Sequence, residues 1–219
     1  MNIHDKFYNS LPRFPVSFLL MRRIVICTWL MLLFGCIVGI FWYNDWKYNI
    51  PTPVPADYYS VPIGTVLAIN AGNTIAGDKP LFLHFFNPDC PCSRFNITHV
   101  RDLIRKYGSK TNFKLVLVTN KQYTASEIQE RFDVDVDVLN DSGLSKACGV
   151  YSTPQAVIID ATQKLYYRGN YNRSRYCTDK KTNYAEAAIV QLINNNYSNF
   201  FASGALKAYG CELPGCKKP

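Results

Sequence analysis

The residues of this chain best suited to chemistry are Cys90 and Cys92, which are separated by a single proline. Neighbouring thiols can exchange electrons with a substrate by making and breaking a disulfide bond. A C-x-C disulfide closes a small, strained ring, and strain makes a disulfide easier to reduce. The pair predicts a thiol–disulfide centre in which Cys90, expected to be the more exposed thiol, attacks and Cys92 resolves. The structural alternative is two inert, buried cysteines.

The flanking sequence places the pair where a strand passes into a helix. Leu81–Phe86 is short and apolar apart from His84, which is typical of a buried central strand. Asn87-Pro88-Asp89 ends that strand, because proline cannot continue a ladder and Asn and Asp favour turns. Ser93–Tyr107 then has apolar residues at helical spacing. The dipole and the free N–H groups at the start of such a helix stabilise a thiolate.

The segment Phe85–Ser93, F-F-N-P-D-C-P-C-S, resembles the thioredoxin motif F-W-x-x-W-C-x-x-C. Aligned without a gap, Cys90 falls on the nucleophile of the family and Ser93 on its resolving cysteine. Shifted by two residues, Cys92 falls on the second family cysteine and Asp89 on the nucleophile. Neither alignment leaves an intact C-x-x-C, so the resemblance implies the thioredoxin fold more strongly than thioredoxin chemistry.

A second segment, Gly149–Ile159, resembles the part of thioredoxins in which a cis-proline opens the third core strand. By this resemblance the Thr153–Pro154 bond is cis and Thr153 presents its backbone to a substrate; a trans proline at a strand edge is the ordinary alternative. The resemblance covers Leu81–Asn195 and implies an α/β, thioredoxin-like fold with a central mixed sheet flanked by helices. Similar proteins are membrane-anchored bacterial thiol–disulfide oxidoreductases, which act on protein thiols and disulfides.

The N-terminal part of the chain predicts one membrane span. Ile24–Tyr43 is a run of 20 residues without a charge, and at about 1.5 Å per residue it crosses a bilayer core of roughly 30 Å. Residues 1–23 contain four Lys and Arg against one Asp, so the positive-inside rule places them in the cytoplasm and the following domain outside. A cleaved signal peptide is the alternative, although we find no small-x-small cleavage site. Cys36 lies in a faint lipoprotein-like box.

The expected order is a cytoplasmic N-terminus (1–23), a transmembrane helix (24–43), a proline-rich linker (44–60) that spaces the domain from the membrane, a thioredoxin-like domain (61–197) and a C-terminal tail (198–219). The predicted location is the inner membrane, crossed once, with the domain in the periplasm or another extracytoplasmic space. Further elements are expected as strands at Gly64–Ile69, Phe113–Val118, Val134–Val138 and Lys164–Arg168, and as helices at Thr124–Phe132, Gly143–Cys148 and Tyr184–Ile193.

Six of the eight cysteines follow the apolar run, and an even number in an oxidising compartment is compatible with disulfides. Cys211 and Cys216 flank a Pro-Gly turn, which favours a local structural disulfide between them. Cys148 is a second candidate resolving thiol because it closely precedes Pro154. Cys177 lies in a cationic segment and is either a further reactive thiol or a structural cysteine.

Charge and composition argue against several other classes. The net charge of +8 is spread along the chain without a continuous basic run, which excludes an extended nucleic-acid surface. The acidic residues between Asp133 and Asp141 lack the glycine and the final glutamate of an EF-hand loop. No cofactor and no metal are expected, and the expected partners are protein thiols and disulfides and membrane lipid.

Two other interpretations are compatible with the same cysteines. Soft thiolates select Cu(I), so the pair could bind or deliver copper. A third ligand would have to come from outside the pair, because His99 lies about 10 Å further along the helix and His84 lies within the strand. The second alternative is a non-catalytic scaffold that binds a partner through the substrate groove of the fold.

Overall fold

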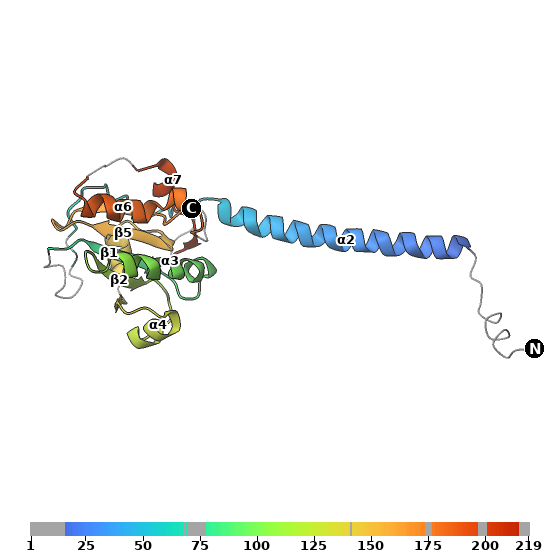
Figure 1. Cartoon of the computed structure of the whole chain (residues 1–219), viewed down its shortest axis with the longest axis horizontal. Coiled ribbons are helices and arrows are strands. Elements are labelled where there is room, and N and C mark those ends of the chain that lie inside the picture. Colours follow the sequence, from blue (N-terminus) through green and yellow to red (C-terminus); the bar gives the residue numbers. More distant parts are fainter. Residues whose placement is uncertain are drawn as a thin grey trace, which may run out of the picture. The chain divides into compact units, whose positions relative to one another are not determined.

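A computed structural model of the 219-residue chain describes residues 16–67, 69, 78–140, 142–173, 177–196 and 201–214. The chain divides into two compact units, Met1–Lys47 and Tyr48–Pro219. Most of the first unit is helix α2, Val16–Asn49 (Figure 1). Its stretch Ser17–Trp46 is long and apolar enough to cross a membrane, and the side chains of this stretch are exposed. The helix therefore extends beyond the uncharged run Ile24–Tyr43 at both ends.

The second unit is built on a five-stranded sheet in the order β3-β2-β1-β5-β6. Its strands are β1 Leu81–Phe86, β2 Asn112–Leu117, β3 Asp137–Leu139, β5 Gln155–Ile159 and β6 Leu165–Gly169. Strands β1, β2 and β3 run parallel, and β5 is antiparallel to both β1 and β6. A separate two-stranded sheet joins β4 (Ser152–Thr153) to β7 (Cys211–Glu212).

The side chains of β1 alternate between two apolar cores, as the period of two in a strand requires. Phe82 and Phe86 pack in a core with residues of α3 and α6, whereas Leu83 and Phe85 pack in a core with α5 and residues 61–67. All six residues of β1 are buried. Burial on both faces explains why this strand is apolar throughout except for His84.

Helices connect the strands on both sides of the sheet. They are α3 Pro91–Tyr107, α4 Ala125–Phe132, α5 Ser142–Ala147, α6 Tyr184–Ile193 and α7 Ser203–Leu206, with a 3-10 turn at Lys180–Thr182. Helix α3 carries the chain from the end of β1 to the parallel strand β2, and Figure 1 shows α3 and α6 beside the strands. At the start of α4 the Thr124 hydroxyl accepts from the Glu127 N–H and the Glu127 carboxylate accepts from the Thr124 N–H, which is the capping box that the sequence indicates.

A β-α-β unit followed by an antiparallel hairpin and a helix makes this a thioredoxin-like fold, as the resemblance over Leu81–Asn195 implies. The main elements begin and end within a few residues of their expected bounds. The accessory strand expected at Gly64–Ile69 is reduced, within the described part of that segment, to a single bridge between Val66 and Lys164.

Candidate functional site

The turn between β1 and α3 presents Cys90 at the start of the helix. Cys90 is the N-cap residue, and Pro91 occupies the first turn, a position that proline favours because its missing N–H needs no partner there. The Asn87 N–H donates to Ser93 Oγ at 3.2 Å, and the Asp89 N–H donates to Asn87 Oδ1 at 2.9 Å. Ser93, which falls on the resolving cysteine in the ungapped alignment, is fully buried and holds the turn instead.

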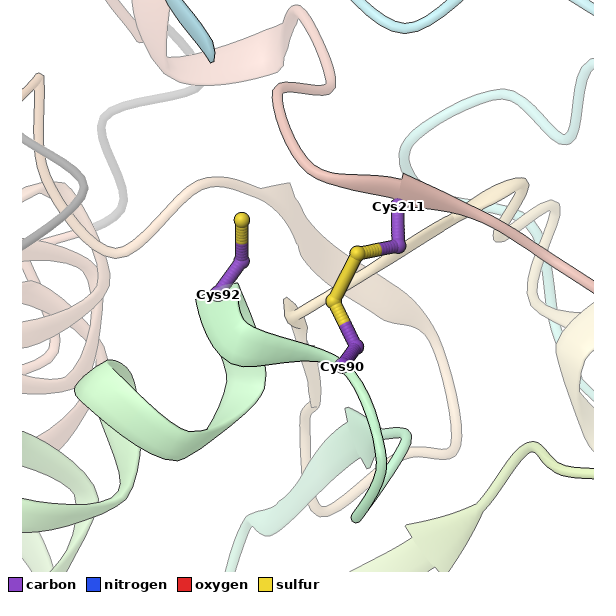
Figure 2. Close-up of side chains that lie close together, drawn as sticks. All are labelled: Cys90, Cys92 and Cys211. Atoms are coloured by element: carbon purple, nitrogen blue, oxygen red, sulfur yellow. A yellow bond between two sulfur atoms is a disulfide. The ribbon is translucent and has the colours of Figure 1, made fainter. Parts of the chain in front are cut away.

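Cys90 forms a disulfide with Cys211 and not with Cys92 (Figure 2). The bond joins residues 121 positions apart whose Cα atoms are separated by 6.6 Å, within the usual span of a disulfide. Cys92 carries a thiol beside this bond, and the three sulfur atoms lie within 4.8 Å of one another. We call these atoms the three-sulfur group. The structure thus brings the predicted pair together and adds a third cysteine to it.

The expected local disulfide between Cys211 and Cys216 is wrong for this structure, because the Cys211 sulfur is bonded to Cys90. Cys216 itself lies outside the described residues. The physical reason is strand pairing: β7 runs antiparallel to β4, with Cys211 opposite Thr153. This pairing carries the tail across the N-terminus of α3, and it outweighs the local turn that the Pro-Gly sequence favours.

The proline-rich segment before the domain holds β7 in place. Thr52 is only 5% exposed, and its N–H donates to the Ala208 carbonyl at 2.8 Å. The Thr52 hydroxyl lies 2.9 Å from Ser152 Oγ and donates to the Gly210 carbonyl at 3.2 Å. Gly210 in turn passes so close to the Thr153 carbonyl that a side chain there would collide with the backbone. A segment expected to act as a spacer is therefore packed, at Thr52, against the tail and β4.

The Thr153–Pro154 peptide bond is cis, which confirms the prediction. Thr153 and Pro154 are the residues that the family resemblance assigns to substrate binding, and Thr153 pairs with Cys211 through its backbone. The Thr153 side chain is fully buried, and Oγ1 has no hydrogen-bond partner in the part of the chain that the structure describes. The strand edge expected to receive a substrate is thus occupied by the chain's own tail.

Exposure does not distinguish the two cysteines of the turn, since Cys90 and Cys92 are each 5% exposed. The expectation that Cys90 is the more exposed is therefore wrong, because the tail covers it. The carboxyl group of the neighbouring Asp89 has a lowered pKa: burial opposes ionisation, but hydrogen bonds from Tyr123 and Lys121 outweigh it. The Lys121 ammonium lies 3.2 Å from this carboxylate, so a cation partly offsets the negative charge of Asp89 next to Cys90.

The two additional thiols expected from the sequence lie elsewhere. Cys148 is fully buried in the core beneath α5, and Cys177 contacts α3 through a hydrogen bond that its sulfur accepts from Asn96 at 3.1 Å. Burial raises the pKa of the Cys177 thiol to about 11, although the hydrogen bond from Asn96 acts in the opposite direction. A thiol of that pKa is protonated near neutral pH and a poor nucleophile. Neither cysteine joins the three-sulfur group.

Among the described residues, the three-sulfur group is the one cluster of three or more His, Cys, Asp or Glu side chains close enough together to hold a metal ion, and it could do so only after its disulfide is reduced. The histidines are not part of it. His84 Nδ1 lies 2.7 Å from the Tyr171 hydroxyl, and burial, with a smaller effect of nearby His99, lowers the His84 pKa to about 3. His84 is thus the packed core residue that its place in an apolar strand indicates.

The sequence does not identify Cys211 as the partner of Cys90. Six cysteines allow fifteen pairings, and their spacing does not choose among them. The signal that could have favoured this pairing is Gly210-Cys211, because a glycine beside a reactive residue often marks a close approach of two backbones. The burial of Thr52 left no comparable pattern in the sequence.

Solved structures with a similar arrangement include a hypothetical protein from Sinorhizobium meliloti 1021, at 18% identity and a TM-score of 0.58, over 71% of this chain and 96% of that chain. An uncharacterized conserved protein from Geobacillus kaustophilus matches at 17% identity and a TM-score of 0.55, over 74% of this chain and 91% of that chain. The solution structure of a thioredoxin-like protein in the oxidized form has 17% identity and a TM-score of 0.44, over 66% of this chain and 97% of that chain. The likeness to the first two shows a shared fold and nothing further.

No curated protein matches the chain. A family match covers residues 68–213, a range that contains the five-stranded sheet, α3 and β7. All three members of the three-sulfur group therefore fall within the matched region. The chain belongs to the family described as Domain of unknown function (DUF6436).

Proposed function

We propose that the chain is a membrane-anchored, extracytoplasmic thiol–disulfide exchange protein whose exchanging sulfur is that of Cys90. The observation that carries this proposal is the Cys90–Cys211 disulfide at the N-terminus of α3. It places a bonded cysteine pair at the strand-to-helix turn of a thioredoxin-like fold, with the Cys92 thiol beside it. The proposed substrates are thiols and disulfides of other proteins.

Reduced Cys90 lies where ionisation is favoured, because the dipole and the free N–H groups of a helix N-terminus lower the pKa of a thiol. A Cys90 thiolate attacks a substrate disulfide, forms a mixed disulfide and releases one substrate thiolate. Attack by the Cys211 or Cys92 thiolate on Cys90 Sγ releases the second substrate thiolate and leaves the site oxidised. In the opposite direction, the oxidised site takes two electrons from a substrate dithiol.

The test uses full-length protein in detergent, with its cysteines oxidised, and glutathione as the thiol. We expect glutathione to open the disulfide in the wild-type protein and in Cys36→Ser, which removes a thiol from α2. We expect Cys90→Ser to form no glutathione adduct at the three-sulfur group. Mass-spectrometric mapping of the adducts measures both outcomes, and a glutathione reaction that survives unchanged in Cys90→Ser would overturn the proposal.

In this proposal α2 is the membrane anchor. Its stretch Ser17–Trp46 is long enough to span a bilayer, and the basic residues within 1–23 support a cytoplasmic position for that end by the positive-inside rule. Protease added to intact spheroplasts should digest the domain and spare a cytoplasmic marker. A domain protected until lysis would contradict this orientation, and a mature protein that starts after α2 would show that the helix is a cleaved signal.

A second candidate function, binding of a soft metal ion, is favoured by the three-sulfur group itself. Its sulfur atoms lie within 4.8 Å of one another, so small side-chain rotations after reduction would place all three around one ion at about 2.3 Å from each sulfur. Thiolates select Cu(I) in particular. Reduced protein titrated anaerobically with Cu(I) against a chelator should then bind one ion per chain and lose it in Cys211→Ser. Binding that is equal in Cys211→Ser and wild type would count against this candidate.

A further inference from the structure

We propose that Gly210–Glu212 is a resident substrate of the site. This segment binds where an external substrate would bind, and the expected substrate is an extended peptide with a cysteine directly after a glycine. Cys92 is the thiol that releases the segment from Cys90. The inference rests on the proposed exchange function and adds the substrate class and the way in which the site opens.

The tail is attached to the site by strand pairing and by a disulfide, which are the two ways in which a peptide substrate could bind there. Its backbone pairs antiparallel with β4, so that Cys211 lies opposite Thr153, and its sulfur is bonded to Cys90. Adding a strand to an exposed edge supplies main-chain hydrogen bonds without regard to sequence, and neighbouring contacts supply specificity. The Cys90–Cys211 bond has the arrangement of a mixed disulfide between the protein and a docked peptide, formed within one chain (Figure 2).

The residue before the cysteine has little room. A side chain at Gly210 would collide with the Thr153 carbonyl and approach Ser152 Oγ to 3.0 Å. Backbone on both sides of the contact cannot move aside as a flexible side chain can, so the docked strand requires glycine at this position. An external peptide that follows the same path is subject to the same restriction.

The residues after the cysteine enter an apolar environment. Leu213 packs against the core that contains Val61 and Val150. Leu213 and Pro214 also line a pocket of about 200 Å³ beside Tyr58 and Val150. A partner with apolar residues two and three positions after its cysteine fills the same space, which adds a second element of recognition to the glycine.

The base of the tail is fixed, so only its end must leave. Ala205 and Ala208 are buried, and their carbonyls accept hydrogen bonds from the N–H groups of Asn170 and Thr52, both at 2.8 Å. Only a few residues separate Ala208 from Cys211, and a tether that short keeps a binding segment at an effective concentration of about millimolar. The resident strand therefore competes with every external peptide and returns when the peptide has left.

Release requires that the Cys90–Cys211 bond be opened without an external reductant. The Cys92 thiol loses its proton, and its sulfur attacks Cys90 Sγ; a Cys90–Cys92 bond forms, the Cys90–Cys211 bond breaks, and Cys211 leaves as a thiolate that takes up a proton. One disulfide and one thiol are present before and after, so no electrons enter or leave. The new C-x-C ring is small and strained, which makes it the better oxidant for an incoming peptide thiol.

The test uses oxidised full-length protein in nanodiscs and two peptide thiols, Tyr-Gly-Cys-Glu-Leu-Pro with the sequence of the tail and Tyr-Ala-Cys-Glu-Leu-Pro as its match. The initial rate of peptide adduct formation at Cys90 is measured by mass spectrometry after acid quench, with glutathione as a small thiol that does not need the strand edge. We expect the glycine peptide to react roughly tenfold faster than the alanine peptide. The alanine side chain would collide with the Thr153 carbonyl, which should weaken binding of the alanine peptide about tenfold. We expect Cys92→Ser to slow the glycine peptide by a similar factor and Cys36→Ser to leave it unchanged.

Equal rates for the two peptides, with the glutathione reaction at Cys90 intact, would overturn the resident-substrate proposal and leave the exchange function standing. Loss of the glutathione reaction in the wild-type protein would instead refute the exchange function. In Cys211→Ser the tail is present but not bonded, and oxidation joins Cys90 to Cys92. The peptide thiolate attacks Cys90 Sγ, the Cys90–Cys92 bond breaks, and Cys92 leaves as a thiolate, so the glycine peptide should form its adduct here without a release step. A glycine peptide that reacts with Cys211→Ser as slowly as with Cys92→Ser would show that Cys92 does not act by releasing the tail.

Discussion

Strand β1 supports two polar regions of opposite character. Beyond its C-terminal end lies the three-sulfur group, to which α3 and the distant tail contribute. Midway along it lies a histidine group, which we define as the buried residues His84 and Tyr171 with half-buried His99. The Tyr171 ring centroid lies 5.4 Å from that of His84 and 6.0 Å from that of His99. Strand β1 and helix α3 hold His84 and His99, and Tyr171 follows the end of β6 by two residues. One member of the first group instead arrives on a segment paired through only two residues of β4. The sulfur atoms proposed to react therefore lie where the regular structure ends, and the group held within the fold carries no proposed chemistry.

The electrostatics of the two regions follow the same division. Burial lowers the pKa of His84 to about 3 and raises that of Tyr171 well above its ordinary value, so both are neutral near pH 7. At the other region the lowered pKa of Asp89 keeps a charged carboxylate beside Cys90, with Lys121 as its counter-ion. The buried group is uncharged and packed, and the site next to it keeps ionised side chains at the surface.

The largest expected effect is on the rate of thiol–disulfide exchange, which should depend on the three-sulfur group and not on the histidine group. Cys90→Ser should lower the rate of thiol–disulfide exchange by at least about a hundredfold, because no other group replaces the nucleophile. His84→Gln, which alters the buried group on the same strand, should keep exchange within about threefold of wild type. Glutathione exchange measured on both variants checks this, and an equal loss in His84→Gln would break the division.

The second prediction concerns pH. His84 binds a proton in the unfolded chain below its ordinary pKa of about 6.5, whereas its folded pKa is about 3. The unfolded state therefore binds more protons between these values, and stability falls as pH drops from 6.5 towards 3, by at most about 1.4 kcal/mol per pH unit for this group. His99, whose pKa is also lowered by burial, acts in the same direction.

His84→Gln keeps an amide group for the Tyr171 hydroxyl and removes this titration. The variant should show a shallower loss of thermal stability between pH 6.5 and pH 5 in detergent micelles. This window lies above the range in which carboxyl groups with lowered pKa values, such as those of Asp89 and Glu186, take up protons. An unchanged slope would mean that His84 is not held neutral by its surroundings.

The third prediction tests the attachment of the tail. Gly210→Ala forces the backbone of β7 away from Thr153. This should make the pairing of β7 with β4 less stable by about 1–3 kcal/mol. The Cys90–Cys211 bond should then be reduced at a glutathione concentration several times lower than in wild type. Gly204→Ala is the matched control, since its added carbon would meet Tyr184 at 3.5 Å, an ordinary contact. A redox titration in which the two variants coincide would contradict the close approach at Gly210.

The sequence predicts the sheet well because each of its elements has a local cause. The apolar run of β1, the capping box at Thr124 and the proline at Pro154 act within a few residues of where they stand. The site is predicted only in part: the turn with Cys90 is local, but its disulfide partner is 121 residues away. That pairing depends on strand addition at β4 and on Thr52, which are tertiary contacts and leave no periodic pattern.

The smallest expected effect belongs to Cys177, a thiol that contacts α3, the helix that begins at the site. Its sulfur accepts a hydrogen bond from Asn96, and its pKa is raised to about 11 by burial. In reduced wild-type protein, iodoacetamide at pH 8 should therefore modify Cys90 long before Cys177, because only the thiolate reacts.

Cys177→Ser keeps an acceptor for Asn96 and removes one buried sulfur, so it should cost roughly 1 kcal/mol of stability and leave exchange at the wild-type rate. Alkylation across pH, followed by peptide mapping, measures the order of reaction. If Cys177 is modified as fast as Cys90 at pH 8, burial does not suppress its ionisation. The difference between Cys177 and Cys90 would then depend only on their neighbours. Cys90 has the sulfur of Cys211, brought by the tail, within reach, whereas Cys177 is not part of the three-sulfur group.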